Sequence, residues 1–130
     1  MKLKNIAVLA LRLIAAVIML QTLYFKFTAH PESVDIFTRL GMEPWGRIGT
    51  GVMELIASIL LLSNKTVVWG AILAAGLMAG AIFFHLTKLG IYVNGDPLLF
   101  IYAVTVFVAS LILLVIYRAR IFQLLARKSH

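Results

Sequence analysis

Four long apolar stretches alternate with short polar segments along the 130-residue chain. They cover residues 6–25, 44–62, 66–87 and 97–117. Because a helix of about 20 apolar residues crosses the hydrocarbon core of a bilayer, each stretch predicts a transmembrane helix. The predicted fold class is therefore all-α: an integral membrane bundle of four transmembrane helices, with residues 1–130 forming a single domain.

The polar segment between the first two stretches is amphipathic. Residues 31–41 place Val34, Phe37 and Leu40 on one helical face. This pattern predicts a short helix lying in the membrane interface. Pro44 is expected in the first turn of the second span, where proline is favoured.

The remaining connections are short. Only residues 63–65 join the second and third stretches, so these two helices should be antiparallel neighbours. Before the last stretch, Asn94 and Gly95 predict a turn, Asp96 an N-cap and Pro97 the first helical position. That last helix carries no charge within its span, and we expect it to pack or face lipid without forming a site.

Composition narrows the class of protein. Apolar residues make up 62% of the chain and charged residues 13%, which excludes an ordinary soluble or disordered chain. The net charge of +7 comes from residues beside the apolar stretches, so the bilayer is the expected partner and nucleic acid is not. The chain has no cysteine, and therefore no disulfide, thiol nucleophile or iron–sulfur ligand of its own.

The basic residues also predict an orientation. In a four-span protein most of them would lie on one side: Lys2, Lys4, Lys65, Arg118, Arg120, Arg127 and Lys128. On the other side the acidic residues offset Lys26, Arg39, Arg47 and Lys88. The positive-inside rule then predicts a multi-pass protein of the inner (plasma) membrane with both termini in the cytoplasm.

Ionisable residues inside the apolar stretches are the candidates for function, because charge in hydrocarbon is costly. Arg12, Ala15, Met19, Thr22 and Lys26 share one face of the first helix. Arg12 is expected to snorkel towards the cytoplasmic surface. Lys26 either snorkels outward or turns inward towards a carboxylate.

Glu54 lies about ten residues inside the second stretch, at a depth where an unpaired carboxylate is unfavourable. Its helical neighbours Thr50, Gly51, Ala57 and Ser58 are small, which favours close approach of another helix. Glu54 should therefore point into the bundle. It either joins helices through Lys26 or a hydroxyl group, or handles protons.

His85 lies about one turn before the end of the third helix. Small residues and a methionine share its face: Ala71, Ala74, Met78 and Ala81. Gly76 and Gly80 form a second small face, so we expect this helix to be packed on two sides. His85 either hydrogen-bonds a neighbour in the interface or handles protons or a ligand.

The predicted directions of the helices bring Lys26, Glu54 and His85 into the outer half of the membrane. Glu54 and His85 are the candidate catalytic, proton-handling residues. The candidate ligand-binding residues of an outer-facing polar pocket are Lys26, Thr50, Ser58 and His30. The spacing matches no metal or haem ligand motif, and no metal site is predicted.

The order of several residues is typical of one family. These are Arg12 and Lys26 in the first helix, Phe37 and Gly41 in the loop, Pro44 and Gly46, then Gly49, Gly51 and Glu54, and finally His85. In this order and spacing the chain resembles the DoxX-like family of small four-helix membrane proteins, over nearly its whole length. Leu23 departs from the pattern, since the family usually has glycine three residues before the lysine.

This resemblance implies a redox-associated membrane subunit. Members are similar to the membrane subunit of a thiosulfate:quinone oxidoreductase, and others are linked to thiol or quinone stress. It implies a quinone-proximal or redox-complex membrane subunit, quinone as a possible cofactor, and a soluble redox subunit or a homo-oligomer as partner. Two alternatives stay open: a non-catalytic membrane anchor or assembly protein, and a small proton-coupled transporter. A quinone subunit predicts an apolar cleft, an anchor a sealed bundle, and a transporter a water-filled path to Glu54.

Overall fold

A computed structural model describes residues 2–93 and 95–128 of the chain, with side chains through residue 126. The described residues are mostly helical and contain no β-strand. The long helices are α1 (Leu3–Phe27), α3 (Trp45–Leu62), α4 (Val67–Phe84) and α5 (Leu98–Ile116), and α4 continues as one π-helical turn, η1 (His85–Leu89). Within the described residues, four spans are long and apolar enough to cross a membrane, when α4 and η1 are counted as one. The predicted all-α membrane bundle is confirmed.

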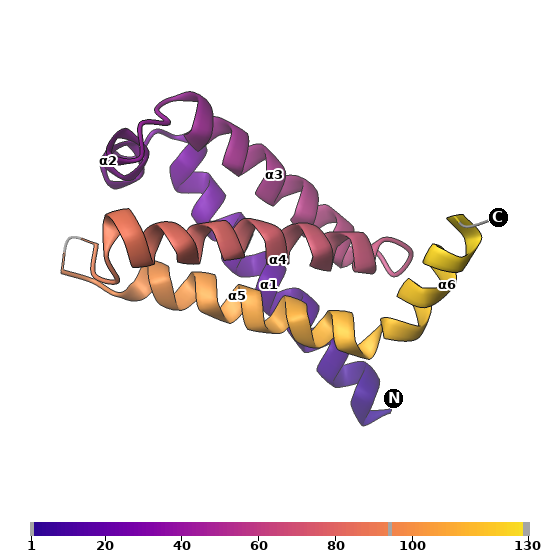
Figure 1. Ribbon diagram of the computed structural model, residues 1–130. Helices are drawn as coiled ribbons and strands as arrows, with labels where there is room; N and C mark the ends of the chain where they lie inside the picture. Colours follow the sequence, from indigo (N-terminus) through magenta and orange to yellow (C-terminus); the bar gives the residue numbers. More distant parts are fainter. Residues whose placement is uncertain (1, 94, 129–130) are drawn as a thin grey trace.

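The four long helices form a ring in which each packs against two others. Helix α1 lies between α3 and α5, and α4 contacts both α3 and α5 on the other side. The directions alternate along the chain. In Figure 1, α3 and α4 lie close together near their short connection and diverge towards the opposite end.

Two short helices mark the ends of this bundle. Helix α2 (Pro31–Arg39) covers the end at which α3 and α4 diverge, which we call the α2 end (Figure 1). It confirms the predicted amphipathic segment. Helix α6 (Arg118–Lys128) turns away from α5 at the other end, the α6 end, where residues 63–66 also lie. Helix α6 was not predicted from the sequence.

Two predicted helix starts are displaced by one residue. Pro44 is the N-cap of α3 and Pro97 the N-cap of α5, so neither is the first helical residue. Asp96 still serves this helix start, because its Oδ1 accepts a hydrogen bond of 2.9 Å from the Leu98 amide. Asn94 of the predicted turn lies outside the described residues.

The hydrophobic core fills mainly the α6 half of the bundle. Its buried members near that end include Leu61, Val67 and Leu113, each with no exposed surface. Small residues such as Ala71 bring the helices close there. The interior of the α2 half is filled less completely.

Glycines of α4 explain why the two halves differ. A Cβ atom on Gly70 would lie 2.6 Å from the Leu61 amide nitrogen, so α3 and α4 cross there almost backbone to backbone. A Cβ on Gly76 or Gly80 would meet nothing within 4 Å. Helix α4 is packed on two sides as predicted, against α3 and α5, but Gly76 and Gly80 do not form either contact. The close crossing with α3 uses Gly70, and the two helices diverge from there towards the α2 end (Figure 1).

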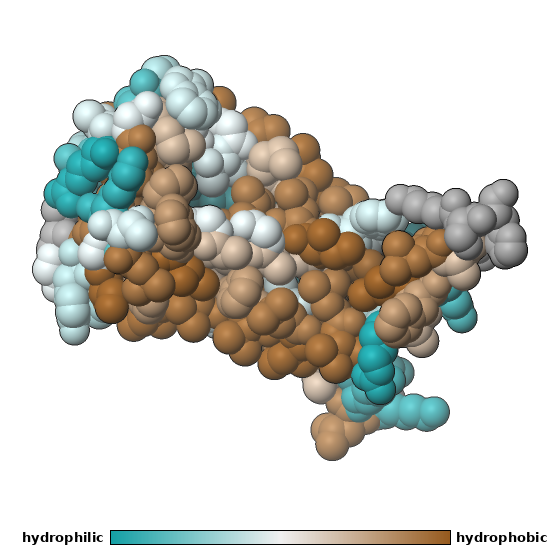
Figure 2. Space-filling model, in the orientation of Figure 1, coloured by the Kyte–Doolittle hydropathy of each residue, from teal (hydrophilic) through white to brown (hydrophobic). Residues whose placement is uncertain are grey.

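The outer surface matches a bilayer. On the face that Figure 2 shows, apolar side chains cover the middle of the molecule, and hydrophilic residues gather over the α2 end and part of the α6 end. Large apolar side chains such as Ile59, Phe83 and Val115 are exposed along the long helices. The protein is thus built to contact lipid along its sides.

Candidate functional site

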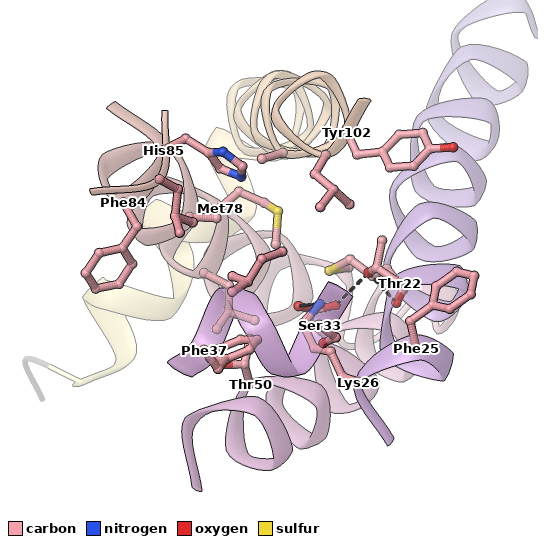
Figure 3. Close-up of a pocket in the computed structure, with 18 of the residues that line it drawn as sticks. Thr22, Phe25, Lys26, Ser33, Phe37, Thr50, Met78, Phe84, His85 and Tyr102 are labelled. Atoms are coloured by element: carbon pink, nitrogen blue, oxygen red, sulfur yellow. Dashed lines mark hydrogen bonds and ion pairs between the residues drawn. The ribbon is translucent and has the colours of Figure 1, made fainter. Parts of the chain in front are cut away.

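A cavity of about 620 Å³ occupies the α2 half of the bundle. All of the long helices and α2 contribute to its wall, and the wall is mostly apolar (Figure 3). We call it the α2-end cavity. Its presence argues against the sealed bundle that a purely structural anchor predicts.

An ion pair lies on the α1 and α3 side of this cavity. Lys26 Nζ is 3.0 Å from Glu54 Oε1, and the Thr22 hydroxyl donates to Glu54 Oε2 at 3.0 Å. The Glu54 side chain is 3% exposed and that of Lys26 is 15% exposed, so both are largely shielded from solvent. Of the two alternatives for Lys26, the structure has the inward one, with the ammonium paired to a carboxylate. Burial strengthens their mutual attraction and makes loss of either partner costly.

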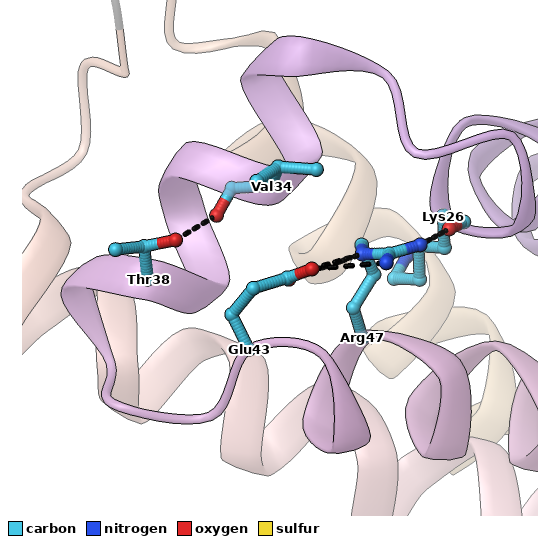
Figure 4. A network of polar contacts seen from close by, with 5 residues as sticks. All are labelled: Lys26, Val34, Thr38, Glu43 and Arg47. Atoms are coloured by element: carbon cyan, nitrogen blue, oxygen red, sulfur yellow. Dashed lines mark hydrogen bonds and ion pairs between the residues drawn. The ribbon is translucent and has the colours of Figure 1, made fainter.

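Arg47 fixes the two helices that carry this pair. Its Nε donates to both carboxylate oxygens of Glu43, to Oε1 at 2.9 Å and to Oε2 at 3.0 Å. Its Nη1 donates to the main-chain carbonyl of Lys26 (Figure 4). Nearby, Phe27 packs so closely on Gly51 that a Cβ there would lie 2.7 Å from the ring. The end of α1 is therefore held against the start of α3, one residue from Lys26. The sequence pattern predicted Arg47 only as a charge on the outer side.

His85 lies on the opposite side of the cavity, where α4 passes into η1. The ring is 6% exposed, and Phe100 of α5 contacts it edge-on with ring centres 5.7 Å apart. Its Nδ1 is 3.0 Å from the Gly90 carbonyl oxygen. A carbonyl can only accept, so Nδ1 carries the hydrogen and the neutral ring has its lone pair on Nε2. That nitrogen has no hydrogen-bond partner among the residues that the structure describes.

Gly90 makes the His85 contact geometrically possible. Its φ is +79°, in the left-handed region that glycine adopts without a side-chain clash. The chain leaves η1 there, and the Gly90 carbonyl meets the ring five residues earlier. Figure 3 shows the His85 ring directed towards the interior, with Met78 and Tyr102 on the same side and Lys26 across from it.

Other predicted pocket residues fall into two groups. Thr50 and His30 line the cavity, although His30 is exposed and its Nδ1 accepts the Glu32 amide at 3.3 Å as the cap of α2. Ser58 does not line it. The Ser58 hydroxyl is fully buried and donates to the main-chain carbonyl of Glu54 at 2.8 Å. Ser58 therefore supports the helix beside Glu54.

Arg12 corrects another expectation, because it does not snorkel. Its side chain is buried; Nε donates to the Leu61 carbonyl at 2.6 Å and Nη1 to Asn64 Oδ1 at 2.7 Å. The last carbonyls of α3 lack donors within the helix, and a guanidinium supplies one. Arg12 therefore joins α1 to the end of α3 at the α6 end, far along α1 from the cavity.

Helix α5 also differs from its expected role. Although it is uncharged, it contributes Leu98, Tyr102 and Ala103 to the cavity wall. Tyr102 brings a phenol to a wall that the sequence treated as packing or lipid-facing. Across residues 2–93 and 95–128, no three His, Cys, Asp or Glu side chains gather as a metal site would require.

Comparison with known proteins assigns the chain to a family. No curated protein and no solved structure matches it. The DoxX family model matches residues 7–87, which is more than half of the chain. The matched region runs from α1 into η1 and includes Arg12, Lys26, Glu54 and His85. The chain belongs to the DoxX family of membrane proteins.

Proposed function

We propose that this protein is the membrane subunit of a redox complex, which binds a quinone in the α2-end cavity and exchanges protons with it. The observation that carries the proposal is the pairing of two polar walls within one apolar cavity. Lys26 and Glu54 lie on one wall, and His85 with an uncommitted Nε2 lies on the other. Quinone is the substrate.

The size and lining of the cavity support this ligand class. Sites for small organic molecules are typically about 300–1,000 Å³, mostly apolar, with a few placed polar groups. The α2-end cavity has about 620 Å³ and aromatic side chains such as Phe37, Phe84 and Tyr102. A quinone ring needs such apolar faces together with hydrogen-bond partners at its two oxygens.

Thr22 allows Glu54 to change its protonation state. The Thr22 hydroxyl lies 3.0 Å from both Glu54 Oε2 and the Met19 carbonyl. When Glu54 is ionised, the hydroxyl donates to the carboxylate. When Glu54 is protonated, the hydroxyl can donate to Met19 and accept the new O–H. Both forms are hydrogen-bonded, which suits a group that gives and takes protons.

The electron balance requires a partner. Reduction of a quinone to a quinol consumes two electrons and two protons. In the proposed complex, Lys26, Glu54 and His85 lie beside the quinone ring and transfer the two protons to it. The chain contains no cysteine and therefore no thiol or iron–sulfur ligand of its own. In this proposal the two electrons come from a redox group on another subunit, for which a soluble protein is the expected carrier.

Charge distribution supports an outward-facing cavity in the inner (plasma) membrane. The segments at the α6 end contain lysines and arginines and no acidic residue. Four of the five acidic residues belong to the segments 28–44 and 90–97 at the α2 end. By the positive-inside rule, the α6 end and both termini are cytoplasmic.

The packing favours a binding subunit over a transporter. Transport would require a path from Glu54 to the α6 end, but that half of the bundle is filled by side chains such as Leu61, Val67 and Leu113, all without exposed surface. The anchor alternative accounts for the ion pair, which joins α1 to α3, but it gives no role to the cavity.

The test compares Glu54→Gln with Asp35→Asn. Glutamine keeps the shape and hydrogen-bonding oxygen of Glu54 but cannot release a proton. Asp35 is an exposed acid of α2 that pairs with Arg39 and does not line the cavity, so its amide variant is the matched control. In a strain that depends on this protein, we expect both variants at normal membrane abundance and quinone reduction lost only with Glu54→Gln.

Mass spectrometry of lipids extracted from the purified protein provides the binding measurement. We expect a quinone to copurify with the unmodified protein and with Glu54→Gln. A Glu54→Gln protein at normal abundance with full activity would exclude proton transfer through Glu54 and favour the anchor alternative.

A further inference from the structure

The α2-end cavity continues sideways between α3 and α4. The two helices touch at Gly70, where a Cβ would lie within 3.0 Å of three backbone atoms of α3. Towards the α2 end, Gly76 and Gly80 both line the cavity, and Gly76 is exposed. The same face of α4 therefore meets the cavity and the surroundings.

The depth of this gap places it within the hydrocarbon. Gly76 is nine residues after Val67, or about 14 Å along a span of 23 residues. The middle of such a span lies near the middle of a bilayer. Neighbouring exposed side chains on α3, such as Met53 and Ile56, are apolar. A molecule in the gap would therefore contact lipid tails and not water.

We infer that the gap between α3 and α4 is a lateral opening, through which a ligand with a polar ring and a long apolar tail enters from the bilayer and along which its tail remains. This inference rests on the proposed function and narrows its substrate to membrane-resident, long-tailed quinones. His85 gives independent support for a ligand. Its side chain is more than nine-tenths buried and points into the cavity. Its Nε2 has no hydrogen-bond partner in the described part of the chain.

The absence of side chains on Gly76 and Gly80 is what keeps the opening free. Both positions belong to a helix, where glycine costs stability relative to alanine by about 0.5–1 kcal/mol. Neither is needed for a close helix contact within the chain, since a Cβ on each would reach no neighbour. A role in admitting a ligand accounts for both glycines.

The experiment blocks the opening with Gly76→Leu/Gly80→Leu. Gly49→Leu is the matched control, because Gly49 is an exposed glycine of α3 with nothing within 4 Å of its Cβ and does not line the cavity. Equilibrium binding is measured in lipid nanodiscs with two probes. One is a quinone carrying a long isoprenoid tail, and the other is the same ring without the tail.

We expect the double variant to raise the Kd of the tailed quinone at least about tenfold, because forcing side chains into occupied space commonly costs that much. The Kd of the tail-less ring should stay within about twofold, a change well below 1.4 kcal/mol. Gly49→Leu should change neither. Comparing each variant with the unmodified protein cancels the partitioning of the tailed probe into the bilayer.

Three results would overturn the inference. Unchanged binding of both probes would show that the tail does not pass between these helices, and equal loss of both would indicate a collapsed cavity. A change of oligomeric state in the double variant, measured by light scattering, would assign the face to a second copy. If neither probe binds even the unmodified protein, the proposed function fails as well, so the two failures are distinguishable.

Discussion

Replacing Lys26 by methionine tests the electrostatic reasoning about the cavity most directly. Methionine keeps the unbranched stem of lysine but removes the charge that lies 3.0 Å from Glu54 Oε1. The Glu54 side chain, 3% exposed, would then be left buried without its counter-charge. Removing one partner of a buried pair typically costs about 3–5 kcal/mol.

The reverse substitution should cost less. Glu54→Gln leaves Lys26, whose side chain is 15% exposed near the end of α1 and can extend its ammonium towards the interface. We expect a loss of about 1–2 kcal/mol, of the order of a charged hydrogen bond. The double variant Lys26→Met/Glu54→Gln removes both charges and should be more stable than Lys26→Met alone. Arg39→Met, which breaks the exposed pair with Asp35, is the control and should cost about 0.5 kcal/mol or less.

The free energy of unfolding is measured by reversible denaturant titration in mixed micelles. The comparison of Lys26→Met with the double variant isolates the unpaired carboxylate, because both variants lack the lysine charge. A Lys26→Met penalty below about 1 kcal/mol, or one that the second substitution does not reduce, would refute the view that this pair is a desolvated, charged contact.

Two further predictions follow from the helix crossing and from the charge distribution. Gly70→Leu should destabilise the bundle by about 1–3 kcal/mol or more, because its Cβ would collide with the backbone of α3, while Gly76→Ala should not destabilise it; equal losses in the same unfolding titration would contradict the assigned crossing. Reporter fusions at Lys65 and after Arg127 should report the cytoplasm and one at Asp35 the exterior, and a periplasmic signal at the C-terminus would reverse or break the proposed topology.

The elements that the sequence predicted are those set by local pattern. Hydropathy over 20 residues identified the spans, and a spacing of three and four placed Lys26 and Thr22 on the inward face of α1. Because Glu54 was the only acid inside a span, its pairing with Lys26 could also be predicted. The spans and the inward face were inferred from single helices. The ion pair could be inferred because each of its two charged residues had few possible partners.

The misjudged residues depend on contacts that a helical pattern does not contain. Arg12 finds acceptors 49 and 52 residues away, at a helix end whose position follows from the fold. The sequence pattern predicted faces of small residues on α4. It did not distinguish Gly70, which contacts another helix, from Gly76, which lines a cavity. Arg47 did have a readable signal, since Glu43 precedes it by four residues.

The polar contacts of the cavity leave its two walls unconnected. On one side Arg47 and the Lys26–Glu54 pair join α1 to α3. On the other, His85 is bonded only within the segment that joins α4 to α5. No hydrogen bond or ion pair links Glu54 to His85 in the described part of the chain. Each wall is therefore held in place by its own contacts, as a preorganised site requires. The space between the walls can take a ligand that carries polar atoms at both ends of an apolar ring. The proposed ligand would fit this arrangement, because a para-quinone would place one oxygen at each wall.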